Sequence, residues 1–192
     1  MEKFWQKQSL KNKDLNIKLF ITDIDGVWTD GGMYYSENGD ELKKFHTGDS
    51  AGILFLKIIN IKTAIVTGER TKIVEKRARK LSIDDIYLGV KNKVSVANDL
   101  KKKYKLKWNE IAFIGDDIND ILLFRKVGLS ACPSSAEDYI KKEVDWVLSK
   151  KGGEGVFREF VQKFLVERNQ LTFVINKYLE SIKNEESSYY TS

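Results

Sequence analysis

The sequence predicts an α/β fold in which helices cover both faces of a mostly parallel β-sheet. Short apolar runs rich in β-branched residues alternate with longer segments in which apolar residues recur every three or four positions. At 192 residues, the chain is long enough for one domain with a sizeable core. One segment departs from the alternation, because aromatic residues flank Asn38-Gly39 and so predict a projecting β-hairpin.

The expected elements follow one another in a regular order. A strand at residues 17–22 comes first, followed by the hairpin at 31–44 and a helix at 50–60 that Thr47 or Asp49 would cap. Further strands are expected at 62–67, 85–88, 110–114, 129–132 and 146–148, and further helices at 70–81, 92–104, 118–126, 136–141 and 154–165. Such alternation is typical of parallel strands joined by helical crossovers.

The two ends of the chain differ from this central domain, which we place at residues 15–168. Residues 1–14 are rich in lysine, and we expect a flexible extension there. Residues 169–192 hold apolar side chains at helical spacing up to Ile182, which predicts an amphipathic helix that needs a packing partner. Residues 184–192 are expected to be frayed.

Composition narrows the possible function classes. The 33 basic residues exceed the 28 acidic ones by only five and are spread along helices, so an anionic small substrate is favoured over nucleic acid. No apolar stretch is long enough for a membrane span. The single cysteine, Cys132, excludes an internal disulfide and is expected to be an inert core thiol. With no signal-like run at its start, the chain is expected to be cytoplasmic.

Carboxylates and other reactive groups follow the predicted strands. Asp23 and Asp25 come directly after the first strand and can point the same way. Two carboxylates about 4 Å apart repel by roughly 4 kcal/mol at an effective dielectric constant near 20, so a cation or a proton must offset them. Thr67, Lys93 and Asp116 follow later strands, and the carboxyl ends of parallel strands form the ligand crevice. Taken singly, each group also suits an acidic turn, a helix cap or a solvated surface.

The order of these groups resembles the haloacid dehalogenase superfamily. Its four motifs match Asp23-Ile24-Asp25-Gly26, Thr67-Gly68, Lys93, and Gly115-Asp116-Asp117 with Asp120. The resemblance implies a Rossmann-like phosphatase domain that uses Mg²⁺, a hard cation suited to oxygen ligands. It also implies that Asp23 is the nucleophile and Asp25 the general acid and base, that Thr67 and Gly68 bind the phosphoryl group, and that Lys93 neutralises charge. The implied metal ligands are Asp23, the Asp25 carbonyl and Asp116. Asp117 and Asp120 would lie in or beside the metal shell.

Members of this superfamily often carry a mobile cap domain that closes the site. Residues 25–67 hold only the hairpin and one helix, and residues 67–93 only one helix and one strand, so no cap fits. Capless members commonly close the site with a neighbouring subunit. The resemblance therefore implies a homo-oligomer, a tetramer, whose contacts come from the hairpin and the C-terminal region.

Three segments resemble, more narrowly, phosphatases of 2-keto-3-deoxy sugar acids: residues 25–32, 49–52 and 152–159. One group acts on 2-keto-3-deoxynononate 9-phosphate in sialic acid biosynthesis. The other acts on 3-deoxy-D-manno-octulosonate 8-phosphate in lipopolysaccharide biosynthesis and typically has Gly-Arg after the motif threonine. This chain has Gly68-Glu69, as in the first group, so the nine-carbon substrate (or N-acylneuraminate 9-phosphate) is expected and the eight-carbon one is the alternative.

Three further side chains bear on the substrate. Glu69 can accept hydrogen bonds from sugar hydroxyls, and Arg77 and Lys80 share one helix face that can grip a carboxylate if it borders a site. These charges also suit the two ends of a helix. Arg158 could reach a neighbour's pocket or pair with Glu154, and a position on the rim of the site is expected for His46, the only histidine.

Two other classes of protein remain as alternatives. A receiver-type signalling domain also combines acidic residues, Thr and Lys on a parallel sheet, but its phosphoacceptor lies in the middle of the chain. A catalytically silent oligomerisation domain is the second alternative, and the complete set of motifs argues against it.

Overall fold

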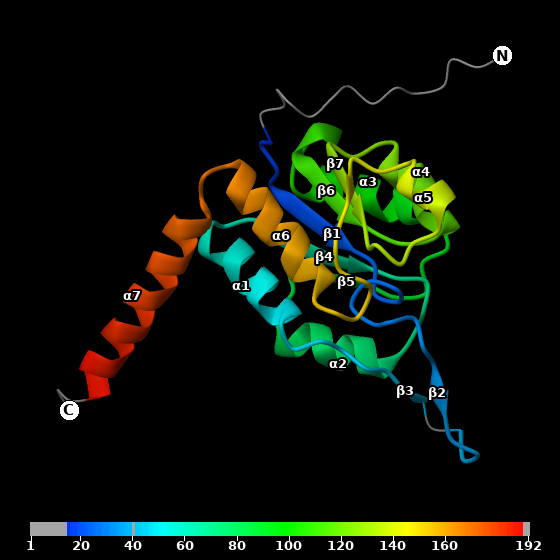
Figure 1. Cartoon of the computed structure of the whole chain (residues 1–192), viewed down its shortest axis with the longest axis horizontal. Helices are drawn as coiled ribbons and strands as arrows, with labels where there is room; N and C mark the ends of the chain where they lie inside the picture. The colour runs from blue at the N-terminus through cyan, green and yellow to red at the C-terminus, as the bar shows by residue number, and fades with distance from the viewer. Residues whose placement is uncertain (1–14, 40, 190–192) are drawn as a thin grey trace.

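Six parallel strands form the central sheet, in the order β5-β4-β1-β6-β7-β8 (Figure 1). The computed structural model describes residues 15–39 and 41–189, so the predicted extension at residues 1–14 lies outside the described part. The strands are β1 Leu19–Thr22, β4 Lys62–Val66, β5 Asp85–Tyr87, β6 Ile111–Ile114, β7 Leu129–Cys132 and β8 Trp146–Val147. Each pair of neighbours runs parallel, which confirms the predicted sheet.

Helices cover both faces of this sheet, as predicted. One face carries α1 Asp49–Ile58, α2 Lys72–Lys80 and α6 Val156–Glu167, and the other carries α3 Lys93–Lys103, α4 Ile121–Phe124 and α5 Asp138–Lys141. Short 3₁₀ turns at Trp108–Glu110 (η2) and Ile118–Asp120 (η3) precede β6 and α4. Side chains alternate along β1, so Phe20 joins the first core while Leu19 and Ile21 join the second.

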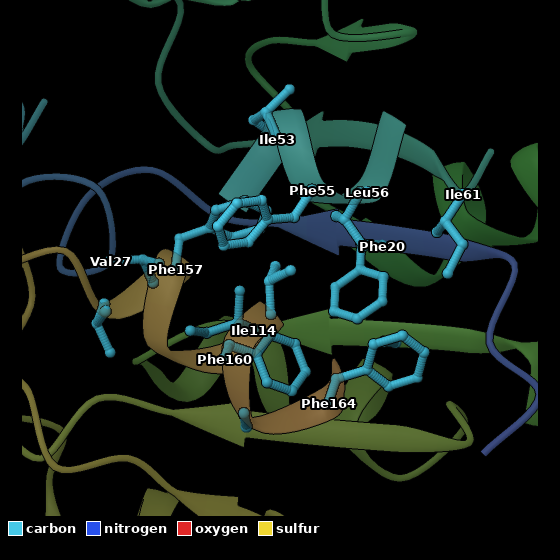
Figure 2. Packing of buried hydrophobic residues seen from close by; sticks show 14 of the residues in the cluster. Phe20, Val27, Ile53, Phe55, Leu56, Ile61, Ile114, Phe157, Phe160 and Phe164 are labelled. Atoms are coloured by element: carbon cyan, nitrogen blue, oxygen red, sulfur yellow. The ribbon is translucent and has the colours of Figure 1, made fainter. Parts of the chain in front are cut away.

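Aromatic rings fill the core between β1 and α6 (Figure 2). The Phe20 ring lies 5.2 Å from the Phe160 ring and 5.1 Å from the Phe164 ring, measured between centroids. Beyond the end of β1, Trp28 stacks on Phe157 at 4.9 Å, and its indole N–H donates to the Thr22 hydroxyl at 2.9 Å. Because each buried ring contributes about 2 kcal/mol, this cluster fixes the loop after β1 against α6.

The hairpin projects from the body of the molecule, as predicted (Figure 1). Its strands, β2 Tyr34–Tyr35 and β3 Glu41–Leu42, pair antiparallel. Gly39 has a φ of 84°, and its N–H donates to the Ser36 carbonyl at 3.0 Å, so the turn falls where Asn38-Gly39 predicted it. Within the described residues, only this hairpin and α1 lie between β1 and β4, and only α2 and β5 lie between β4 and α3, so neither segment holds a cap domain, as predicted.

Several predicted helix starts are wrong: α5 and α6 begin at Asp138 and Val156 rather than at residues 136 and 154, and the starts of α1 and α2 differ for visible reasons. Neither Thr47 nor Asp49 caps α1, because the N-cap residue is Gly48 and no side chain bonds there. The Asp49 side chain instead turns inward and accepts a hydrogen bond from the Arg158 backbone N–H at 3.0 Å. Helix α2 begins at Lys72 rather than at residue 70, because the Thr71 hydroxyl accepts from the Val74 N–H and fixes the start.

The last helix, α7, spans Leu171–Tyr189 and is longer than predicted. The expected fraying from residue 184 is wrong up to Tyr189. Val174 is buried where α7 begins beside α1 and α6, but Phe173, Tyr178 and Leu179 remain exposed as the helix leaves the body (Figure 1). None of the helices in residues 15–39 and 41–189 combines the length and the hydropathy of a membrane span.

Candidate active site

The predicted reactive residues meet at the carboxyl ends of three neighbouring strands. Asp23 and Asp25 follow β1, Thr67 follows β4, and Asp116 lies just beyond β6. A polar pocket of about 290 Å³ opens there and is lined by Asp23, Asp25, Gly26, Gly31, Met33, Thr67, Gly68, Glu69, Asp116, Asp117 and Asn119. Residues that lie far apart in the sequence therefore surround one cavity, because parallel topology brings strand ends together.

Asp23 is held in a fixed orientation at the floor of this pocket. One carboxylate oxygen accepts the Ile24 backbone N–H at 2.8 Å, and the other accepts the Lys93 ammonium at 2.5 Å. Burial raises the pKa of Asp23 to about 6, although Lys93 acts in the opposite direction. An oriented carboxylate with an ammonium beside it suits a nucleophile that must approach an anionic group.

Lys93 is the first residue of α3, and its side chain is fully buried. Besides Asp23, its ammonium contacts the Asp120 carboxylate at 2.6 Å. Burial lowers the pKa of Lys93, but the two carboxylates outweigh it, so that its pKa lies above the ordinary value. Lys93 therefore stays charged and holds two acidic loops together.

Asp120 acts as a support for the loop after β6. One of its oxygens accepts the backbone N–H groups of Asp116 and Asp117 at 3.0 and 3.3 Å, and the other accepts Lys93. Oxygens of Asp23, Asp116 and Asp120 lie within 4.8 Å of one another, a spacing that a metal ion can bridge. Both oxygens of Asp120 and both oxygens of Asp23 already accept hydrogen bonds, whereas no described group donates one to the Asp116 carboxylate, so Asp116 is the most available ligand of the three.

Asp116 fits a cation site on grounds of charge. No group in the described part of the chain donates a hydrogen bond to its carboxylate. Burial, followed by the charges of Asp23 and Asp120, raises the pKa of Asp116 to about 8. An added Cβ on Gly26 would lie 1.8 Å from an Asp116 oxygen, so the glycine backbone is needed for this close approach. A divalent cation here would offset the repulsion among these carboxylates.

Asp25 has a partner that sequence analysis missed. The Lys43 ammonium lies 2.8 and 2.7 Å from the two carboxylate oxygens of Asp25, and the Thr29 hydroxyl donates to one of them at 3.2 Å. Lys43 follows β3 of the hairpin and is next to Lys44, and the sequence gives no sign of which of the two lysines points inward. Met33 and Asn119 also line the pocket without any earlier signal.

Thr67 and Gly68, for which phosphoryl binding was predicted, follow β4 at the edge of the pocket. Thr67 is almost fully buried, and its hydroxyl accepts the Glu69 backbone N–H at 3.3 Å. Thr67, Gly68 and Glu69 all line the pocket beside Asp23. A hydroxyl and backbone amides at one wall of an acidic pocket can bind anionic oxygens.

Arg77 and Lys80 do not line this pocket. The Arg77 guanidinium carbon lies 6.0 Å from the centroid of the Phe45 ring, and its Nε and Nη2 atoms are buried without a hydrogen-bond partner in the described part of the chain. Lys80 is exposed near the end of α2. Their expected contact with a substrate carboxylate stays a prediction, and it requires a pocket other than that of their own chain.

His46 and Cys132, the only histidine and cysteine of the sequence, do not line the pocket. The His46 Nδ1 atom accepts the Gly48 backbone N–H at 3.0 Å, and the residue is exposed. Cys132 is buried, and burial raises the pKa of its thiol to about 12. The thiol is thus unsuited to nucleophilic catalysis, as expected.

Comparisons with known proteins point in one direction. A family model described as haloacid dehalogenase-like hydrolase matches residues 69–160. The 3-deoxy-D-manno-octulosonate 8-phosphate phosphatase of Haemophilus influenzae is 36% identical over 177 residues, which cover 91% of this chain and 98% of that protein. The protein of the same name from Escherichia coli K12 is 37% identical over 156 residues, or 81% of this chain and 83% of the relative.

Solved structures agree with these sequence matches. The cobalt-bound octulosonate phosphatase from Haemophilus influenzae is 36% identical, with a TM-score of 0.81 over 85% of this chain and 97% of that one. The Moraxella catarrhalis phosphatase, in complex with a magnesium ion, a phosphate ion and a KDO molecule, is 32% identical, with a TM-score of 0.82 over 85% of this chain and 94% of that one.

Proposed function

Because the chain belongs to the haloacid dehalogenase-like hydrolases, and among them to capless phosphatases of the octulosonate 8-phosphate type, we propose that it hydrolyses the phosphate ester of a 2-keto-3-deoxy sugar acid. One observation carries the proposal. The Asp23 carboxylate, paired with Lys93 at 2.5 Å, faces a pocket that it shares with Thr67 and Asp116. This is the set of groups that phosphoryl transfer to a carboxylate requires.

Asp23 is the proposed nucleophile. Its carboxylate oxygen attacks phosphorus, the bond from phosphorus to the sugar oxygen breaks, and an aspartyl phosphate forms on Asp23. Thr67 and the Gly68 amide bind the phosphoryl oxygens, while Lys93 stabilises the negative charge that Asp23 and the phosphoryl group share.

Asp25 is the proposed general acid and base. It gives a proton to the departing sugar oxygen and later takes one from the water that attacks the aspartyl phosphate. Asp25 lines the same pocket as Asp23, on the side of the hairpin.

Magnesium is the proposed cofactor. Asp23, Asp116 and the Asp25 carbonyl would hold it, with Asp120 and Asp117 supporting the loop behind them. When bound, the ion supplies charge neutralisation and orientation for the phosphoryl group. The elevated pKa of Asp116, about 8, marks the carboxylate for which such a cation matters most.

The comparisons favour the eight-carbon substrate over the nine-carbon one expected from the sequence. Both relatives quoted above are named for 3-deoxy-D-manno-octulosonate 8-phosphate, and we propose that compound as the substrate. One observation keeps the nine-carbon acid as a second candidate. Glu69 lines the pocket, where its carboxylate can accept hydrogen bonds from a longer polyol tail.

Phosphate release from the two keto acid phosphates tests the activity and the substrate together. We expect turnover with Mg²⁺, loss with a chelator, and no turnover by Asp23→Asn. A higher kcat/KM for the eight-carbon ester supports the first candidate, and a higher value for the nine-carbon ester supports the second. If neither ester is hydrolysed while the protein is folded, the proposed function is wrong.

Glu69→Gly tests the argument for the second candidate. If Glu69 binds the longer tail, the variant loses kcat/KM for the nine-carbon ester more than for the eight-carbon one, by about tenfold for one lost hydrogen-bonding group. An unchanged ratio would remove Glu69 from substrate selection.

We also propose that the site is closed by further copies of this chain, as a tetramer. The pocket is open, Tyr35 of the hairpin is 68% exposed, and α7 leaves an apolar face uncovered. In such an assembly, Arg77 and Lys80 could bind the substrate carboxylate of a neighbour. Light scattering coupled to size exclusion measures the state directly, and a fully active monomer would contradict this proposal.

A further inference from the structure

The hairpin reaches back to the catalytic pocket through one buried lysine. Lys43 lies directly after β3, and its side chain is 0% exposed, although the hairpin itself projects from the body. Its ammonium lies 2.8 and 2.7 Å from the two carboxylate oxygens of Asp25 and 3.8 Å from a Glu41 oxygen. Ordering a long side chain costs conformational entropy, and burying its charge costs solvation free energy. Strong partners must offset both costs.

The segment that leads into the hairpin contacts the same Asp25 carboxylate. The Thr29 hydroxyl, also fully buried, accepts the Gly31 backbone N–H at 3.2 Å and donates to an Asp25 oxygen at 3.2 Å. Gly31 and Met33, which begin the hairpin, line the pocket itself. Asp25 is thus held by Thr29 before the hairpin and by Lys43 after β3, so its orientation depends on how the hairpin packs.

We propose that Lys43 is a positioning residue for Asp25, through which the hairpin sets the orientation of the general acid. This inference rests on the proposed phosphatase activity and on the role of Asp25 in it. The ion pairs of Lys43 in the described part of the chain are with Asp25 and Glu41 and not with Asp23, so Lys43 would act through the Asp25 carboxylate that it holds.

The first chemical step shows why such a residue matters. As the bond from phosphorus to the sugar oxygen breaks, the Asp25 proton moves to that oxygen and Asp25 is left with a negative charge. The Lys43 ammonium lies beside the oxygens on which this charge develops. A misplacement of about 1 Å in such a group can lower the rate by about 100-fold.

Two substrates with different leaving groups test this role. A sugar alkoxide is a poor leaving group that needs a proton, whereas p-nitrophenolate leaves well without one. Because kcat/KM reports only the steps up to departure of the leaving group, it isolates the contribution of the acid. We expect Lys43→Met to lower kcat/KM for the sugar acid phosphate by about 10- to 100-fold and for p-nitrophenyl phosphate by less than about threefold.

The two kcat/KM values are measured on one protein sample. Partial unfolding lowers both values by the same factor, so their ratio does not change. Lys43→Arg keeps a cation on Asp25 and is expected to restore the wild-type ratio to within about threefold. Lys44→Met is the matched control, because the Lys44 side chain is 69% exposed and points to Asp30 instead, 3.9 Å away. It should leave the ratio unchanged.

The outcomes separate this inference from the proposed function. If the wild type hydrolyses neither ester, the proposed phosphatase function is wrong, and the role of Lys43 in it is wrong as well. If the wild type is active and Lys43→Met lowers both values equally, or leaves the ratio unchanged, Lys43 has only a structural role and the inference is overturned. A loss in Lys43→Arg as large as that in Lys43→Met would also overturn it.

Discussion

Asp116→Asn should make the metal-free protein more stable while abolishing its response to magnesium. Burial and two neighbouring charges raise the pKa of Asp116 from its ordinary 3.8 to about 8. Between pH 3.8 and about 8, the Asp116 carboxyl is protonated in the folded protein but already ionised in the unfolded chain. Its unfavourable contribution is therefore absent below about pH 4 and grows as the pH rises towards 8.

The size of the effect follows from the same difference. One pKa unit corresponds to about 1.4 kcal/mol, so at pH 7 the folded state is disfavoured by about 4 kcal/mol at most. Solvent reaches part of the Asp116 side chain and screens it, so we expect Asp116→Asn to raise the free energy of unfolding by about 2 kcal/mol.

Urea denaturation with chelator, at several pH values between 5 and 8.5, measures this directly. Asp23 and Asp49 also have raised pKa values, near 6, so wild type and variant are compared above pH 7, where Asp116, with a pKa of about 8, is the carboxyl group still titrating. Saturating Mg²⁺ should then stabilise the wild type by about 3 kcal/mol at 100 times the dissociation constant, and the variant hardly at all.

Asp99→Asn is the control, because this carboxylate on α3 is exposed and its removal should change the stability by less than about 0.5 kcal/mol. The reasoning is refuted if Asp116→Asn is no more stable than the wild type without metal, or if Mg²⁺ stabilises both proteins equally.

Three further predictions concern buried groups. Lys93→Met should lower the free energy of unfolding of the metal-free protein by about 3 to 5 kcal/mol and abolish phosphate release, because two carboxylates lose their cation; a loss under about 1 kcal/mol in denaturation would contradict it. Gly152→Ala should lower stability by about 1 to 3 kcal/mol together with kcat, because the new Cβ would lie 2.0 Å from the carbonyl oxygen of Gly26, which directly follows Asp25. Wild-type kinetics in that variant would show that the loop adjusts freely. The buried Cys132 thiol, with its pKa raised to about 12, should not react with a thiol reagent until the protein is unfolded, and rapid labelling of native protein would refute its burial.

The residues that meet at the pocket were predictable because their sequence signals are local and the parallel topology brings them together. An apolar run followed by Asp23 and Asp25 marks a strand end without knowledge of any partner, and the same holds for Thr67 and Asp116. Once the strands are parallel, these ends must meet at one edge of the sheet. Lys93 required only that its helix follow a strand.

Side-chain directions were not predictable in this way. The spacing of Arg77 and Lys80 gave the helix face that they share but not what that face borders, and it turns out to lie away from the pocket of its own chain. Asp49 suited a helix cap by its position, yet its carboxylate pairs with a backbone N–H more than 100 residues away in the sequence. Such choices depend on tertiary packing, which outweighs local preference.

Lys43 shows the same limit at the point where it matters most for function. Its tie to Asp25 joins the base of the hairpin to the proposed acid, while Tyr34, Tyr35 and Leu42 expose apolar surface farther along the same hairpin. If further copies of the chain cover that surface, their packing also fixes the orientation of Asp25. Dissociation of the assembly should then impair hydrolysis of the sugar ester more than that of p-nitrophenyl phosphate, as Lys43→Met does. Equal losses of both activities on dilution would mean that assembly and proton donation are independent.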